Sequence, residues 1–106
     1  MCILSGGEYM LKWIENWYRS ICNGGWEHMY GITIDTLDNP GWDVNIDIID
    51  TYLEDVEFNK VRQYNDDNDW FICEKKDGKF IGCGDASKLE VILGIFKEWA
   101  ESVDID

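Results

Sequence analysis

The chain has 106 residues, with 22 acidic against 9 basic side chains and a formal net charge of −13. This length suits one domain, which we expect to span residues 1–106, and the 45% hydrophobic and 14% aromatic content excludes wholesale disorder. The negative charge argues against nucleic acids and anionic membrane surfaces as partners, because both are bound mainly through contacts to phosphate.

The first periodic segment, from about residue 8 to residue 22, is predicted to be an amphipathic helix. Its apolar side chains recur every three or four residues: Leu11, Ile14, Trp17, Tyr18 and Ile21. Ser5 and Glu8 have the spacing of a capping box at its start. Asn23-Gly24-Gly25 predicts its end, because glycine readily adopts the left-handed conformation found after a helix.

Two segments with alternating apolar and polar residues follow, at 30–36 and 42–48. They predict a β-hairpin around the turn Asp38-Asn39-Pro40-Gly41, with a loop of three to five residues. Proline presets the first central position of such a turn, and we expect Gly41 to take the positive φ of the second position in a type II turn.

The apolar faces of this hairpin coincide only if Ile34 lies opposite Val44 or Ile46. That register puts a mostly acidic set on the opposite face: Thr33, Asp35, Asp43, Asn45 and Asp47. Like charges on paired strands destabilise a sheet. An acidic face without a local lysine therefore suggests a functional reason for its charge.

The middle of the chain predicts less regular structure. Tyr52 to Phe58 is either a short third strand or an irregular edge, and residues 64–69 read as a polar turn. Residues 70–74 and 79–83 predict a second hairpin around Lys76-Asp77-Gly78, since Asp-Gly is a strong turn dipeptide.

A final helix is predicted from its continuous apolar stripe: Leu89, Ile92, Leu93, Phe96, Trp99, Ala100 and Val103. We expect Asp85 or Ser87 to cap its start, and Ser87 with Glu90 offers a capping box.

This order of elements predicts an α+β fold. We expect an antiparallel sheet of four to five strands, because its connections are short, with an N-terminal and a C-terminal amphipathic helix packed on one face. The other face would be left to solvent or to a partner.

The cysteines (Cys2, Cys22, Cys73 and Cys83) form no C-x-x-C pair, and the chain has one histidine, so we expect no zinc site. The N-terminus does not read as an export signal, which favours reduced thiols and a cytoplasmic location. Asp66-Asp67-Asn68-Asp69 lacks the glycine and distal glutamate of a calcium loop. We expect neither a metal nor another cofactor.

Trp26-Glu27-His28 contains the one histidine beside a carboxylate. A small enzyme using His28 with a nearby carboxylate as an acid–base pair is one interpretation. Adjacent residues of an extended chain point to opposite sides, however, which argues against Glu27 orienting His28. We favour a structural or contact role and no catalysis.

Negative charge is concentrated in residues 35–69, which hold eleven acidic and two basic side chains. This stretch is either an ordinary solvated surface or a surface that attracts a basic partner. We expect Trp42 and Trp26 to be exposed and to add contact area. The candidate partner-binding residues are Asp35, Asp38, Trp42, Asp43, Asp47, Asp50, Glu54 and Asp55.

Several strings together resemble the immunity protein 53 family of bacterial polymorphic toxin systems. They are Trp17-Tyr18 followed by Cys22, Trp26-Glu27-His28, Tyr30-Gly31-Ile32 and Thr36-Leu37-Asp38-Asn39-Pro40-Gly41-Trp42, continued by Gly84-Asp85 and the stripe through Leu93, Phe96 and Trp99. The seven-residue string ending at Trp42 is the most specific of them, and the resemblance covers nearly the whole chain.

The resemblance implies a small cytoplasmic protein, encoded beside a toxin, that binds and neutralises the cognate toxin domain. It carries over no catalytic residue. The matched motif residues are structural, toxin-contacting or both: Trp17, Tyr18, Trp26, Glu27, His28, Asn39, Pro40, Gly41 and Trp42. A basic nuclease toxin would complement the acidic chain, while a generic acidic interaction module is the alternative. We expect a monomer or a weak dimer.

Overall fold

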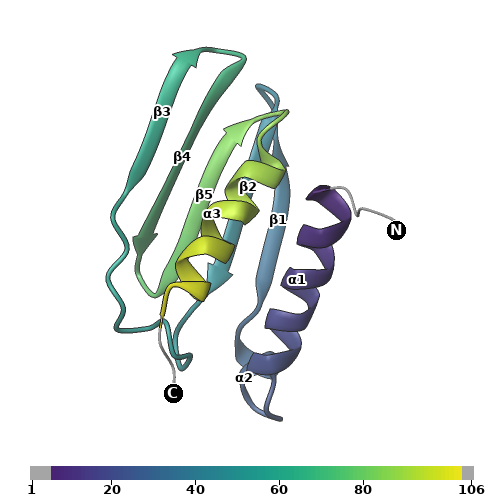
Figure 1. Cartoon of the computed structure of the whole chain (residues 1–106), viewed down its shortest axis with the longest axis vertical. Helices are drawn as coiled ribbons and strands as arrows, with labels where there is room; N and C mark the ends of the chain where they lie inside the picture. Colours follow the sequence, from purple (N-terminus) through teal and green to yellow (C-terminus); the bar gives the residue numbers. More distant parts are fainter. Residues whose placement is uncertain (1–5, 104–106) are drawn as a thin grey trace.

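One five-stranded antiparallel sheet organises the chain, with α3 across one face of it and α1 beside α3 along the β1 edge (Figure 1). The computed structural model describes residues 6–103, and the side chains from residue 10 onward. The elements are α1 (Gly6–Ile21), α2 (Trp26–Met29), β1 (Ile32–Leu37), β2 (Gly41–Asp47), β3 (Val61–Asp66), β4 (Asp69–Lys76), β5 (Lys79–Asp85) and α3 (Leu89–Glu101). The strand order is β1-β2-β5-β4-β3. The predicted α+β class is confirmed.

Helix α1 forms as predicted, and Ile14 and Trp17 of its apolar face are buried, but Leu11 and Tyr18 of that face are exposed. The helix ends at Ile21, and Gly24 after it has φ +93°, as expected of a glycine that follows a helix. The predicted capping box of Ser5 and Glu8 lies outside the residues and side chains that the structure describes.

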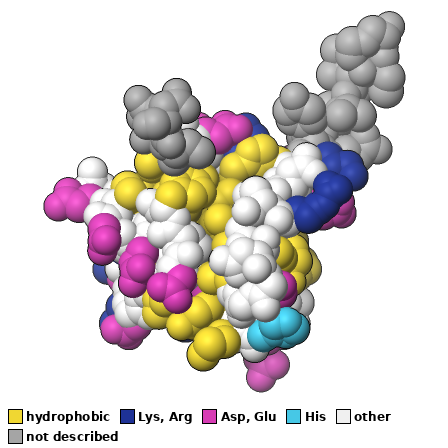
Figure 2. All heavy atoms as spheres, turned by 90° about the horizontal axis from the view of Figure 1, so that it is seen from below, with side chains coloured by type: hydrophobic (Ala, Val, Ile, Leu, Met, Phe, Trp, Pro, Cys, Tyr) yellow, Lys and Arg dark blue, Asp and Glu magenta, His cyan; other side chains and the backbone are white. Residues whose placement is uncertain are grey.

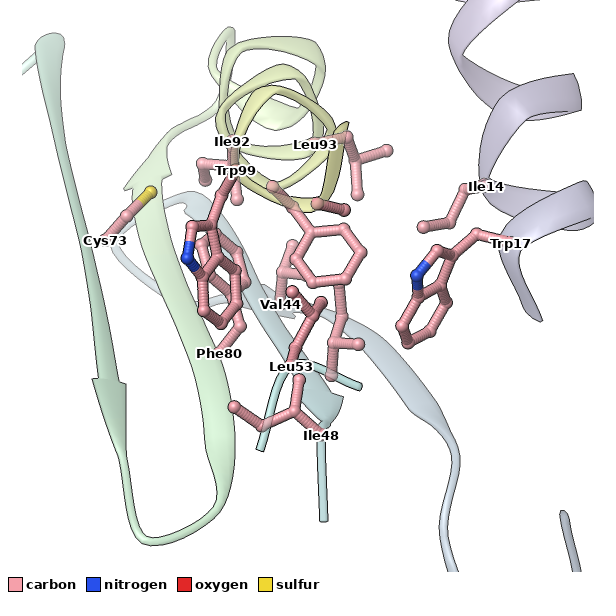
Figure 3. Close-up of a cluster of buried hydrophobic side chains, with 13 residues drawn as sticks. Ile14, Trp17, Val44, Ile48, Leu53, Cys73, Phe80, Ile92, Leu93 and Trp99 are labelled. Carbon is pink, nitrogen blue, oxygen red and sulfur yellow. The ribbon is translucent and has the colours of Figure 1, made fainter. Parts of the chain in front are cut away.

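The core lies between α3, α1 and the sheet, and aromatic rings fill much of it (Figure 3). Phe96 of α3 is fully buried. Its ring centroid lies 4.9 Å from that of Trp17 in α1 and 5.1 Å from that of Phe80 in β5. The predicted stripe of α3 therefore faces the sheet, and one ring links both helices to the central strands.

The predicted cap of α3 is wrong. The residue at the N-cap position is Lys88, and no side chain caps the helix there. Asp85 instead accepts hydrogen bonds from Ser87, from Lys88 and from the backbone N–H of Trp70 in β4, so these polar groups are used before the helix begins.

The first hairpin forms in the predicted register, with Ile34 opposite Val44, and its loop is the three residues between Leu37 and Gly41. Gly41 does not have the positive φ that we expected of it. A Cβ at this position would collide with the carbonyl oxygen of Gly84 on β5. Glycine is therefore required for close strand approach and not for a left-handed turn.

The segment from residue 48 to residue 60 contains no strand, so the irregular alternative is correct. Leu53 is fully buried, and the indole of Trp99 donates a 2.9 Å hydrogen bond to the carbonyl of Glu57. The Lys75 ammonium donates to the carbonyls of Glu54 and Val56 at 2.8 and 2.7 Å. These contacts close the lower end of the core.

Strand β3 was not predicted, and part of it falls in the expected polar turn. All six of its residues are exposed, so no apolar alternation marks it. It pairs with β4 through a turn at Asp67 and Asn68. The predicted hairpin of β4 and β5 is confirmed, and Asp77 and Gly78 at its turn have φ values of 55° and 76°.

Replacement of Phe96 by alanine should destabilise the protein by about 3–5 kcal/mol, because it leaves a cavity among four packed rings. Val91→Ala on the exposed side of the same helix should change stability by no more than about 0.5 kcal/mol. Urea unfolding of the two variants measures both values. Equal losses would contradict the central role of Phe96.

Candidate functional site

Both long helices lie to one side of the sheet, α3 across its face and α1 along the β1 edge, and within residues 6–103 no helix covers the other face (Figure 1). Directly paired residues of antiparallel strands share a face, so the register defines this open face. One row across it runs Asp35, Asp43, Cys83, Ile72 and Arg62, and another runs Thr33, Asn45, Ile81 and Glu74. On one side of these rows lie the paired residues Trp70 and Tyr64. On the other side lie Lys76, Lys79 and Asp47.

The open face is apolar in the middle and acidic on the side of β1 and β2. Ile72, Ile81 and Trp70 are half-buried even though no element within residues 6–103 covers them. Asp35 and Asp43 lie directly opposite each other. A half-buried apolar stripe beside a pair of like charges is typical of a surface that contacts another protein.

Asp43 is held by two neutral donors and by no cation. It accepts hydrogen bonds from the Asn45 amide at 3.2 Å and from the Cys83 thiol at 3.3 Å. In the described part of the chain, neither Asp43 nor Asp35 forms an ion pair. The charge of this pair is therefore left uncompensated on the open face.

Asp47 differs from these two aspartates. Its carboxylate lies 2.6 Å from the Lys79 ammonium and accepts a 2.9 Å hydrogen bond from the backbone N–H of Gly31. The expectation of an acidic face without a local lysine is therefore wrong at this position. The lysine comes from β5, which lies beside β2 only in the folded sheet.

The predicted partner-binding residues fall on separate surfaces. Asp35, Asp43 and Asp47 share the open face, and Asp38 lies in the loop of the same hairpin. Trp42 lies on the helix side, since it precedes Asp43 in the strand, and its indole donates a 2.9 Å hydrogen bond to the Ala86 carbonyl.

The remaining predicted residues, Asp50, Glu54 and Asp55, are exposed in the segment that closes the lower end of the core. Figure 2 views the molecule from that end. Acidic side chains gather on its left side, which is the side of β3 and β4 in Figure 1. The negative charge of residues 35–69 therefore lies in three places: the first hairpin, the 48–60 segment, and the β3–β4 turn with Asp66, Asp67 and Asp69.

The expectation that Trp26 is exposed is wrong, because it is only 4% exposed. Its indole donates a 2.9 Å hydrogen bond to the Ile49 carbonyl, and its ring packs edge-on against Trp17 and Tyr18. Trp26 anchors α2 between α1 and the end of β2, so it contributes to the core instead of adding external contact area.

Glu27 and His28 lie in the helical turn α2 and not in an extended segment, which corrects the expected local structure. The Glu27 carboxylate accepts hydrogen bonds from the backbone N–H groups of Asn23 at 3.0 Å and Gly24 at 2.8 Å. Bonds from its own backbone N–H, and then from these two, lower the pKa of Glu27. The carboxylate that would orient His28 is thus engaged by the turn before α2.

The apolar part of the open face was missed from the sequence. Trp70, Ile72 and Ile81 alternate with Phe71, Cys73 and Phe80, which face the helices. A strand that is apolar at successive positions gives no sign of which face is covered. The run Trp70-Phe71-Ile72-Cys73 was the available signal, because an apolar side chain on both faces indicates either two covered faces or a contact surface.

Three described cysteines, Cys22, Cys73 and Cys83, are free. Burial raises the pKa of Cys73 to about 12, and burial with the hydrogen bond to Asp43 raises that of Cys83 to about 11. Thiols with such pKa values stay protonated near neutral pH and react slowly.

Among residues 6–103, no three His, Cys, Asp or Glu side chains are grouped so that they could hold a metal ion. In the same part of the chain, none of the helices combines the length and the apolar character needed to cross a bilayer.

A family model for immunity protein 53 matches residues 11–101. The chain belongs to the immunity protein 53 family. Searches of curated proteins and of solved structures gave no match. Membership confirms the resemblance seen in the sequence and indicates an immunity protein whose partner is a protein toxin.

Several motif residues of this immunity protein have structural contacts that account for them. Trp26 and Glu27 build the turn around α2, and Gly41 allows β2 to approach β5. His28, Asn39 and Pro40 are exposed. The motif therefore combines residues that hold the fold with a few that remain accessible.

Asp85, also in a matched string, is buried where β5 leads into α3. It accepts hydrogen bonds from the N–H of Trp70 at 2.8 Å and from the N–H and hydroxyl of Ser87 at 2.7 and 2.6 Å. The Lys88 ammonium lies 2.8 Å from both Asp85 and Asp69. Lys88 first and Ser87 second hold the pKa of Asp85 well below its usual range. Asp85 thus ties β4 and β5 to the start of α3.

Because folding lowers the pKa of Asp85, its stabilising effect is complete above about pH 4, the ordinary Asp value, and is lost as the pH falls toward the folded value. Asp85→Asn should lower Tm at neutral pH by several degrees and flatten the decrease of Tm on acidification. Circular dichroism melts over the acid range measure both effects. Asp38→Asn, in the exposed hairpin loop, is the charge-matched control, and equal behaviour of the two variants would contradict the assignment.

Proposed function

We propose that this immunity protein neutralises its cognate toxin by covering a basic surface of the toxin with the open face of its sheet. The observation that carries the proposal is the uncompensated pair of Asp35 and Asp43 beside the half-buried apolar stripe. A basic cleft of the kind that a nuclease uses to hold a polyanionic substrate would fit this face. Occupying that cleft would exclude the substrate.

Energetics support the open face as the centre of the contact. Two aspartates paired across strands repel each other in the free protein, and a lysine or arginine from the toxin would replace that repulsion by attraction. Trp70, Ile72 and Ile81 supply the apolar area that such a contact requires near its middle. The acids of the 48–60 segment would add long-range attraction and accelerate association.

Neutralisation inside the producing cell places the protein in the cytoplasm. In this role it works by binding and performs no catalysis, and Glu27, engaged by the chain, does not assist His28. A generic acidic module would instead bind many basic proteins with little selectivity. One tight complex with the toxin domain encoded beside its gene distinguishes the two alternatives.

The double variant Asp35→Lys with Asp43→Lys should abolish protection of cells that express the toxin domain and slow association at least tenfold, because attraction becomes repulsion. It adds four charges, changing the net charge from −13 to −9. Growth assays and stopped-flow kinetics at two salt concentrations measure these effects.

Two controls carry the same change in charge. Glu90→Lys with Glu98→Lys alters the exposed side of α3 and should leave protection intact. Glu54→Lys with Asp55→Lys alters the lower end and should slow association only mildly. Full protection by the open-face variant, or its loss in the α3 variant, would move the contact away from the open face.

His28→Ala should preserve the fold and leave neutralisation of the toxin unchanged, because His28 is exposed and its neighbouring carboxylate is engaged elsewhere. Growth protection and Tm measure the two parts of this expectation. Loss of protection without a change in Tm would revive an active role for His28.

A further inference from the structure

The sheet described by residues 6–103 ends at β1, which pairs with β2 on one side and with no strand on the other. The backbone N–H of Asp47 donates a 3.0 Å hydrogen bond to the carbonyl of Gly31, so Gly31 faces β2. In an antiparallel ladder the N–H and C=O of one residue point the same way and alternate along the strand. The backbone groups of Ile32, Ile34 and Thr36 therefore point outward, away from β2.

The strand β1 itself lacks the features that usually prevent strand addition at an edge. It contains no proline, its register with β2 shows no bulge, and Asp35 is its one charged residue. The opposite edge differs, because the register of β3 shifts between Tyr64 and Asp66. A six-residue strand rich in β-branched residues and open at its edge is a ready template for another strand.

A hollow of about 380 Å³ lies along this edge, between β1 and α1. Ile32 and Ile34 line it from the strand, and Ile14 and Tyr18, with Glu15 beside them, line it from the helix. Ile34 is 41% exposed, so α1, which lies beside β1, leaves the hollow open to solvent. The hollow can take apolar side chains from a strand added to β1, while the alternate side chains of that strand would reach the open face near Asp35.

We infer that an extended segment of the toxin pairs with the outer edge of β1 and becomes a sixth strand of the sheet. Its side chains alternate, with apolar groups in the hollow beside Ile34 and Tyr18 and basic groups beside Asp35 and Asp43. This inference rests on the proposed function and adds the mode of binding, since main-chain hydrogen bonds give affinity and the two sets of side chains give specificity.

A second copy of this chain is the less suitable occupant of the edge. Pairing two copies through β1 would join their open faces and bring together two molecules of net charge −13. A basic toxin segment meets no such repulsion, and it compensates the aspartate pair that β1 and β2 leave uncompensated.

Amide exchange, followed by NMR, reports on this edge directly. In the free protein, the N–H groups of Ile34 and Thr36 should exchange much faster than those of Thr33 and Asp35, which point toward β2. Adding the toxin domain encoded beside the gene should slow exchange at Ile34 and Thr36 at least a hundredfold. A complex that leaves these amides unprotected overturns the inference.

A substitution tests the same edge. Ile34→Pro removes a backbone N–H that points outward, so the sheet should still form, but toxin affinity should fall at least a hundredfold. Ile34→Val keeps the N–H and should bind within threefold of the parent chain. Melting curves confirm that both variants fold, and if the proline variant does not fold, the exchange experiment decides.

The outcomes separate this inference from the proposed function. A toxin domain that does not bind the parent chain overturns the proposed function, and the inference with it. If the parent chain binds the toxin tightly and Ile34→Pro binds it equally well, the inference of an added strand is overturned and the proposed function stands. Sedimentation of the free protein tests whether a second copy of the chain occupies the edge. A dimer of the parent chain that becomes a monomer in Ile34→Pro would assign the edge to a second copy.

Discussion

The contact of Phe96 with Trp17 and Phe80 is the interaction on which the rest of the structure depends. It joins both long helices and the central strand β5 through one fully buried ring. In a chain of this size such a cluster supplies much of the apolar burial that offsets the loss of conformational entropy. Because α1 and α3 pack against each other through this ring, both lie to the same side of the sheet, and its other face stays open.

This one-sided arrangement determines what the acidic residues can do. On a sheet covered on both faces, Asp35 and Asp43 would have to be buried and paired at high cost. On an open face they stay hydrated, and their repulsion is a tolerable cost. Asp47 shows the contrast, because β5 brings Lys79 to it and makes it part of the fold. Only the aspartates without such a partner keep their charge available for another molecule.

The sequence predicts the parts of the fold in which one apolar face repeats, namely α1, α3 and the hairpin of β1 and β2 with its register. It also predicts the hairpin of β4 and β5, from the Asp-Gly dipeptide at its turn. It does not predict β3, which is exposed on every side and held by backbone pairing with β4. It also misassigns Trp26, because burial of a large ring depends on what the rest of the chain packs around it. Trp42 is half-buried, and its indole is bonded to Ala86 on the helix side instead of facing the open side. The acidic part of the candidate site can be predicted from the alternation of polar and apolar residues in β1 and β2. Its apolar part cannot, because both faces of β4 carry apolar side chains and only the structure shows which face the helices cover.

The family motif and the proposed contact surface overlap little, and the structure gives a reason. Trp26, Glu27 and Gly41 serve turns and close strand packing, on which this fold depends. Asp35, Asp43 and Ile72 lie on strands where backbone pairing is satisfied whatever the side chain is, so they can change without loss of the fold. A protein that must match one toxin closely would place its specificity in such positions. Residues outside the matched strings are therefore where recognition of a particular toxin is expected to reside.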